Sequence, residues 1–355
     1  MCSQVDQQAT GPWCISADRG SQNRTMQVPE DFSHPWLAAC RERSRDILQR
    51  LAAGTENQQP IFLTLAAAGS LGRLEAGTDS DFDSLFIIAD SGPGEAPREG
   101  LVADAIQAVF DRARECGLAV PKADGIFRAA TTPSVLVDPA ALGSLDESPT
   151  TFGRRMQLLL DARPVFGEAA FSRIRTQVLE WYCSPARVLP AEATWDYLQG
   201  DLVRYAHAYR NWQSFQLARS AHDSWALRQA KLRLVRYVTW MGLFLLIVEA
   251  RAQGDQGQDW LLSRLALSPL ERIVHVLKGE APQAAARIVK AYGDGLRLLQ
   301  EPVVREELIA STAPESTALP HALVRIIEFG DVIRTALQEA ISARCLKEPQ
   351  LALPF

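Results

Sequence analysis

The chain changes character near residue 150, and this change limits the architectures that it can adopt. Before that point, two short apolar runs of strand length, 61–67 and 82–88, lie among helix-like segments. After it, apolar residues recur with helical period almost to residue 346, and prolines fall where one helix must end before the next begins. The pattern predicts an α+β protein, in which a small mixed sheet is followed by an all-helical domain.

We expect three parts: a flexible N-terminal arm, a sheet domain and a helical domain, over residues 1–34, 35–150 and 151–355. The sheet domain should hold helices over Pro35–Gly54 and Leu101–Cys116 and a third strand around Gly125. In the helical domain, the apolar run 238–248 is about half as long as a membrane span. We interpret this run as a buried core helix.

Composition narrows the function classes. The net charge of -5 and the pI of about 5.7 do not supply the basic field of a protein that binds extended nucleic acid. The first 30 residues are polar, and no membrane segment is predicted. The six cysteines are scattered without a C-x-x-C pair, so thiolate metal sites are not expected. We therefore expect a cytoplasmic protein with free thiols.

The stretch from Ala68 to Ile88 holds the residues that point most clearly to chemistry. Gly69 and Ser70 follow the first apolar run, at a turn that should open a short helix. Backbone N–H groups at such a turn can hold an anion, and glycine lets a phosphate approach closely. This segment is therefore a candidate phosphate-binding site.

Two carboxylates, Asp81 and Asp83, follow in the same stretch, at the start of the second apolar run. Side chains two positions apart on a strand share one face. Two neighbouring carboxylates repel each other unless a cation lies between them, and oxygen ligands of this kind suit Mg²⁺. The pair is thus a candidate metal site next to the candidate phosphate site.

These residues, taken in order, resemble the motif of the DNA polymerase β-like nucleotidyltransferase superfamily. The resemblance is carried by the segments Gly69-Ser70, Gly72-Arg73, Glu75 and Ser80-Asp81-Phe82-Asp83. The Gly-Arg-x-Glu insert is similar to the branch that holds the PII uridylyltransferases and related bacterial proteins of unknown role. Later segments resemble those related proteins too: Asp124-Gly-Ile-Phe, 154–164, Asp201-Leu-Val-Arg-Tyr and 225–233.

The resemblance implies a nucleotidyltransferase domain that moves a nucleoside monophosphate from an NTP to a hydroxyl group and releases pyrophosphate. Asp81 and Asp83 would be catalytic and would hold Mg²⁺ or Mn²⁺, and Gly69 and Ser70 would bind the β- and γ-phosphates. The acceptor would be a small molecule or a protein. The alternative is a regulatory nucleotide-binding protein with a degenerate site.

The superfamily usually adds a third catalytic carboxylate on a later strand. Asp124 is our candidate, although an aspartate before a glycine is also typical of a turn. If no third carboxylate exists, transfer should be slow or absent. Arg73 also carries two interpretations: an ion pair with Glu75 that fixes the loop, or a ligand to a nucleotide phosphate.

Cations from the helical domain could complete the site. At about 100° per residue, Arg228 and Lys231 lie within roughly 60° of each other on one helix face. We predict that both bind the triphosphate, with a solvated basic stripe as the alternative. By the same spacing, Arg236 lies nearer to this face than Arg233. Asp161 and Arg163 are expected to be structural residues between the two domains.

Overall fold

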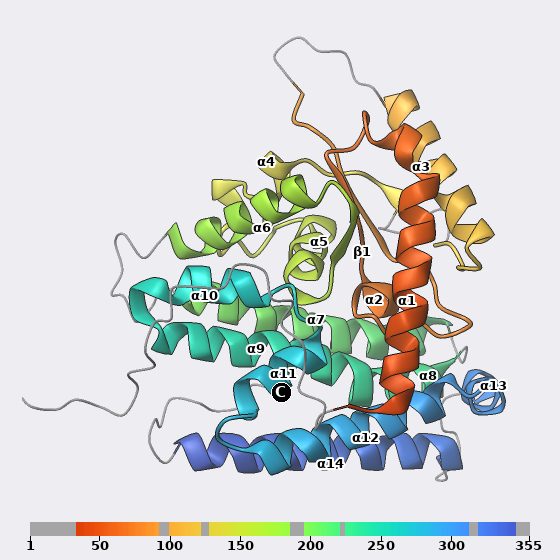
Figure 1. Cartoon of the computed structure of the whole chain (residues 1–355), viewed down its shortest axis with the longest axis vertical. Helices are drawn as coiled ribbons and strands as arrows, with labels where there is room; N and C mark the ends of the chain where they lie inside the picture. The colour runs from red at the N-terminus through yellow and green to blue at the C-terminus, as the bar shows by residue number, and fades with distance from the viewer. Residues whose placement is uncertain are drawn as a thin grey trace, which may run out of the picture.

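The structure is a computed structural model that describes residues 33–91, 99–121, 128–184, 195–220, 224–311 and 319–345. Most of the expected N-terminal arm and the candidate carboxylate Asp124 lie outside these residues. The strands are β1 (Thr64–Ala67), β2 (Ser84–Ile87) and β3 (Arg163–Phe166). The chain is mostly helical with one small sheet, as expected of an α+β protein (Figure 1).

The helices confirm most of the expected segments. The first half of the chain holds α1 (Pro35–Gly54), α2 (Gly69–Gly72), α3 (Glu99–Glu115), α4 (Pro133–Leu136), α5 (Pro149–Leu160) and α6 (Glu168–Cys183). The second half holds α7 (Asp196–Ser220), α8 (Trp225–Lys231), the π-helix η7 (Leu232–Arg236), α9 (Tyr237–Ala252), α10 (Gly257–Arg264), α11 (Pro269–Leu277), α12 (Pro282–Gln300), α13 (Pro302–Ala310) and α14 (His321–Cys345). Short 3-10 turns occur at η2 (Glu56–Gln58), η4 (Pro139–Ala141) and η8 (Gly254–Gln256).

The sheet has the order β2-β1-β3, and β1 pairs antiparallel with both neighbours. Thr64 lies opposite Ile87 on one side, and Ala67 lies opposite Arg163 on the other. The sequence predicts a mixed sheet, but in the described residues both strand ladders are antiparallel, so the prediction is wrong for these ladders. Parallel pairing occurs in isolated bridges, from Asp81 to Ala119 and from Ile87 to Thr131.

The third strand is the main difference from the sequence prediction. We expected it around Gly125, which lies outside the described residues, whereas the structure forms it from Arg163–Phe166. The boundary predicted at residue 150 therefore falls before the last strand of the sheet. The strand follows α5 after a two-residue connection, so the first helix of the expected helical domain leads straight back into the sheet.

Both faces of the sheet are covered, which explains why β1 and β2 are apolar throughout. Leu65, Ala67 and Phe86 pack in one cluster with residues of α1 and α3. Ala66 and Leu85, on the opposite face, belong to the large cluster that runs through the later helices. The sheet and the later helices thus share a core, and each covers apolar side chains of the other.

The later helices surround α9, which is buried along most of its length, as the apolar run 238–248 predicts. Gly242 of α9 allows the close approach of α11, because a Cβ there would lie 2.5 Å from the carbonyl oxygen of Pro269. Helices α12 and α14 lie side by side (Figure 1). Within the described ranges, no helix is both long and apolar enough to cross a membrane.

Candidate functional site

The turn from β1 into α2 has the geometry that its glycines require. Gly69 has a φ of +64°, in the left-handed region that glycine adopts without strain. Gly72 lies against two backbone oxygens, since a Cβ there would be 2.5 Å from that of Ala67 and 2.2 Å from that of Asp161. The turn is therefore pressed against the end of α5, and the carboxylate of Asp83 packs against Gly69 from the other side.

The two carboxylates lie just before β2 rather than inside it. Asp81 is exposed, whereas Asp83 is only partly exposed and is fixed to the turn by a hydrogen bond from the Ala68 N–H to its carbonyl oxygen, at 2.7 Å. Burial, reinforced by the neighbouring charge of Asp81, raises the pKa of Asp83 to about 7. A cation bound between Asp81 and Asp83 would reduce the repulsion between the two carboxylates.

Two serines tie the loop between them. The Ser80 hydroxyl oxygen accepts a hydrogen bond from the Gly77 N–H at 2.9 Å and one from the Ser70 hydroxyl at 3.0 Å. Ser70 lies on the turn of the candidate phosphate site, and its hydroxyl is directed to the loop in this structure. Its role as a phosphate ligand stays a prediction.

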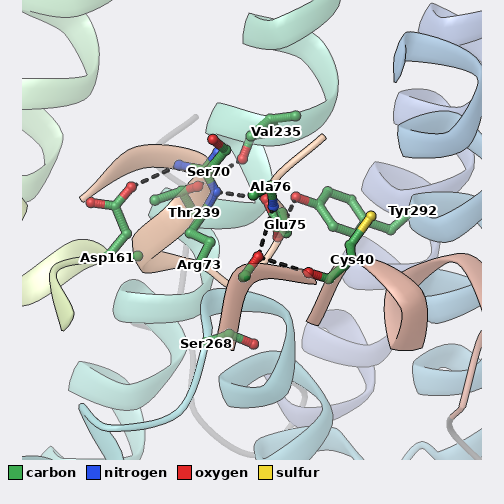
Figure 2. Close-up of polar contacts among 12 residues, drawn as sticks. Cys40, Ser70, Arg73, Glu75, Ala76, Asp161, Val235, Thr239, Ser268 and Tyr292 are labelled. Atoms are coloured by element: carbon green, nitrogen blue, oxygen red, sulfur yellow. Dashed lines mark hydrogen bonds and ion pairs between the residues drawn. The ribbon is translucent and has the colours of Figure 1, made fainter. Parts of the chain in front are cut away.

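Arg73 holds the centre of a buried polar network (Figure 2). Its guanidinium donates to Glu75 and to Asp161, each at 2.7 Å, and Glu75 also accepts a hydrogen bond from the Tyr292 hydroxyl at 2.8 Å. Burial works against the charge of Arg73, but Glu75 and Asp161 outweigh it and raise the pKa of the guanidinium. The predicted ion pair between Arg73 and Glu75 is present.

The position of Asp161 is set by two buried arginines from other helices. Arg175 donates to the carbonyl oxygens of Leu158 and Ala162, and Arg272 donates to those of Leu159 and Leu160. The carbonyls of Leu158, Leu159 and Leu160 belong to the C-terminal end of α5, where a helix leaves acceptors without partners in its own backbone, and Ala162 follows that end. The arginines satisfy these acceptors.

Arg163 joins two further segments, because it donates to the carbonyl oxygens of Gly72 at 3.3 Å and Ala266 at 3.1 Å. The contact with Gly72 ties β3 to the glycine turn, and the contact with Ala266 ties it to the later helices. Together with the ion pair between Asp161 and Arg73, these contacts support the structural role expected for both residues.

The glycine turn, both carboxylates and several later residues line one cavity of about 110 Å³. From the turn and loop, it is lined by Gly69, Ser70, Arg73, Glu75, Gly77, Thr78, Asp79, Ser80, Asp81 and Asp83. From the helices, it is lined by Lys231, Val235, Arg236, Leu296, Leu299, Gln300 and Arg305. The cavity is therefore lined by carboxylates from the loop and by cations from α8, η7 and α13.

The π-helix explains which cations reach this cavity. Lys231 and Arg236 are five residues apart, which an α-helix would separate by about 140°. The wider π-helical turn, with its i to i+5 hydrogen bonds, brings such residues back to one side. Both therefore line the cavity. Arg228, which the sequence predicts beside Lys231, does not line the cavity.

The two cations differ in their surroundings. Lys231 is exposed to solvent, but many protein atoms surround its side chain. The resulting desolvation lowers the pKa of Lys231, and the charge of Asp81 opposes this effect. The Arg236 guanidinium lies 5.0 Å from the centre of the Tyr209 ring. Asp81 acts on Lys231 and Arg236 acts on Asp83, so the two basic side chains lie near the two carboxylates.

The residues fit a divalent cation of the kind that binds together with substrate. Mg²⁺ commonly takes one or two protein carboxylates and completes its shell with water and substrate phosphates. Asp81 and Asp83 can supply the carboxylates. In the described parts of the chain, no group of three or more potential ligands of the His, Cys, Asp or Glu type comes together. Asp124 lies outside those parts, so its assignment stays a prediction.

Several residues of the cavity were not selected from the sequence, and three of them are polar residues of the later helices: Arg236, Gln300 and Arg305. On a uniform helix, Arg236 would lie about 140° from Lys231, although it would be nearer to the face of Arg228 and Lys231 than Arg233 is. Gln300 donates to the carbonyl oxygen of Glu75 at 2.8 Å, and Arg305 pairs with Asp79 at 3.4 Å. Gln300 and Arg305 lie more than 200 positions from the loop that they contact, and no local pattern indicates such a pairing.

Comparisons with known proteins add no family to this description: no protein-family model matches the chain, and no curated protein is significantly similar to it. Functional assignment therefore depends on the geometry of the site and on the motif resemblance.

Proposed function

We propose that the protein is a metal-dependent nucleotidyltransferase, which moves a nucleoside monophosphate from an NTP to a hydroxyl group of a small molecule or a protein. The observation that supports this most directly is the composition of the cavity. Asp81, Asp83, Lys231, Arg236 and the Gly69 turn all line it. A metal and a polyphosphate require ligands of these opposite kinds in one place.

In this proposal, Asp81 and Asp83 hold Mg²⁺ or Mn²⁺. Held by these two residues, such an ion would supply positive charge to stabilise the phosphates. The backbone N–H groups at Gly69 and Ser70 bind the β- and γ-phosphates, and Lys231 and Arg236 bind the leaving pyrophosphate. The acceptor oxygen bonds to the α-phosphorus and loses its proton, while the bond from that phosphorus to the β-phosphate oxygen breaks.

A second candidate function is nucleotide binding without transfer, as in a regulatory protein. One observation favours it: the carboxylate of Asp161, whose charge acts on Asp83, is held by the guanidinium of Arg73 at 2.7 Å. To act as a third metal ligand or as a base, Asp161 would have to leave its buried ion pair with Arg73. This is unfavourable because Arg73 would then be buried with one partner fewer. Under this candidate, NTP binds but no pyrophosphate is released.

The deciding experiment measures thermal stability with ATP, GTP, CTP and UTP, each with and without Mg²⁺. A ligand that binds only the folded protein raises the unfolding midpoint by mass action. We expect a Mg²⁺-dependent rise for at least one NTP, and its loss in Asp81→Ala. Release of pyrophosphate from that NTP, with a cell extract as the source of acceptor, then separates transfer from binding alone. The absence of any shift would contradict both candidates.

A further inference from the structure

A row of aromatic rings runs along α7 to the protein surface, next to a cation that lines the cavity. Tyr205, Tyr209 and Trp212 are four and three positions apart, so they share one face of the helix. The ring centres of Tyr205 and Tyr209 are 6.3 Å apart, and those of Tyr209 and Trp212 are 6.1 Å apart. Tyr209 is also supported from behind by Trp240, at 6.1 Å. The row is therefore a continuous, packed surface.

The inner end of this row adjoins the candidate site. Arg236 lines the cavity and also stands 5.0 Å from the centre of the Tyr209 ring. The phosphate-binding cation and the aromatic row are thus parts of one surface.

The outer end of the row is open. Trp212 is 52% exposed and Phe215, one helical turn further on, is 65% exposed. Large aromatic side chains side by side in water are uncommon on a protein surface and indicate a binding site more often than a packing role. Because this pair continues a row that contacts Arg236, a residue of the cavity, the ligand it suits is one that also enters the cavity.

We propose that Trp212 and Tyr209 form the nucleobase subsite for the NTP whose phosphates enter the cavity. This inference rests on the proposed function and specifies how its donor is held. Two steps of 5.0 and 6.1 Å lead from the Arg236 guanidinium to the Trp212 ring. In an NTP, the ribose separates the phosphates from a flat aromatic base by a comparable length, and every base can stack on an indole ring.

The chemistry of the row also predicts its selectivity. Stacking on an aromatic face needs no particular pattern of hydrogen-bond donors and acceptors, so it accepts every base to some degree. The larger ring of a purine covers more of the Trp212 surface than a pyrimidine does. We therefore expect ATP and GTP to bind more tightly than CTP and UTP.

The test compares two ligands that share phosphates but not a base. Binding of Mg²⁺ with each NTP and of Mg²⁺ with inorganic triphosphate is measured by calorimetry on the full chain. Trp212→Ala should weaken NTP binding by about tenfold, the size expected for one lost stacking contact. It should change the affinity for inorganic triphosphate by no more than about twofold, because triphosphate has no base that could stack on the ring.

Two controls accompany it. Trp212→Phe keeps an aromatic face and should restore most of the NTP affinity. Tyr197→Ala removes another exposed aromatic ring from α7, about 22 Å closer to the N-terminus of the helix at 1.5 Å per residue, and should change neither affinity.

Each result has one meaning. Unchanged NTP affinity in Trp212→Ala, or equal weakening for NTP and triphosphate, overturns the nucleobase subsite while leaving the proposed function in place. A change in oligomeric state with unchanged NTP affinity overturns it in favour of contact between two copies of the chain. If neither ligand binds the wild-type protein, the proposed function fails and this inference fails with it.

Discussion

A Cβ on Gly69 would lie 2.3 Å from Oδ2 of Asp83, so the glycine and the carboxylate occupy adjoining space that no larger residue can share. The position also has a positive φ, which adds a backbone reason for glycine. The candidate phosphate turn and the candidate metal ligand are therefore fitted to each other, and a change in one must move the other.

Gly69→Ala should abolish the Mg²⁺-dependent stabilisation by NTP, because the new methyl group displaces the Asp83 carboxylate. It should also lower the free energy of unfolding by about 1 kcal/mol for the left-handed backbone. Urea unfolding and NTP-induced midpoint shifts measure the two effects. Gly117→Ala is the matched control, since Gly117 has a φ of +83° but nothing within 4 Å of its added Cβ. It should lose stability alone, and loss of NTP binding there would contradict the argument.

The metal-free protein should become less stable as pH rises through 7. Asp83 binds its proton more tightly when folded than when unfolded, because its pKa is raised from 3.8 to about 7. Its contribution to stability is therefore complete below pH 3.8 and is lost as pH rises through 7. Asp83→Asn should remove this loss and stabilise the protein at pH 8.5 by about 1 kcal/mol or more.

This is measured by urea unfolding in EDTA at pH 5 and pH 8.5. Asp255→Asn changes an exposed carboxylate and should leave the pH dependence as it is in the wild type. If Asp83→Asn is less stable than the wild type at pH 8.5, the folded protein stabilises the charged form of Asp83, which contradicts the prediction.

Arg73→Met should destabilise the protein by about 3–5 kcal/mol, because it leaves Glu75 and Asp161 buried without their cation. Tyr292→Phe removes one hydrogen bond to the Glu75 carboxylate and should have a smaller effect, about 1.5–3 kcal/mol. The double variant should lose less than the sum of the two, since both changes act on Glu75. Urea unfolding of the four proteins measures this coupling, and strict additivity would show that the contacts are independent.

Lys231→Ala and Arg236→Ala should each raise the apparent Kd for Mg²⁺ with NTP, by about tenfold for one lost charge-assisted contact. Arg228→Ala is the control on the same helix face predicted from sequence, and it should leave the Kd unchanged because Arg228 does not line the cavity. Titration with inorganic triphosphate should give the same order. An equal effect of Arg228→Ala would show that the π-helical turn does not decide which cations act.

The sequence predicts best where chemistry is local. Gly69, Ser70, Asp81 and Asp83 lie in one short stretch, and the turn that joins them brings them to one cavity. The adjoining strands follow from their apolar runs, because both faces of each strand are buried.

Prediction fails where a distant residue or an irregular turn decides the outcome. The strand Arg163–Phe166 is only four residues long and contains Pro164, which lacks an N–H for pairing, so nothing local indicates a strand. Arg236 lies five positions after Lys231 across the π-helical turn Leu232–Arg236, and a uniform repeat of about 100° per residue does not place these two residues on one side.

The order of strands has a consequence for synthesis on the ribosome. The middle strand β1 is made early, but its second neighbour, β3, follows only later, and the hydroxyl of Thr64 binds a carbonyl 102 residues further on, at Phe166. At about 5–20 residues per second, that interval is on the order of 5–20 s. Throughout it, one edge of an apolar strand has no partner, and this nascent stage is when the chain most needs protection from aggregation.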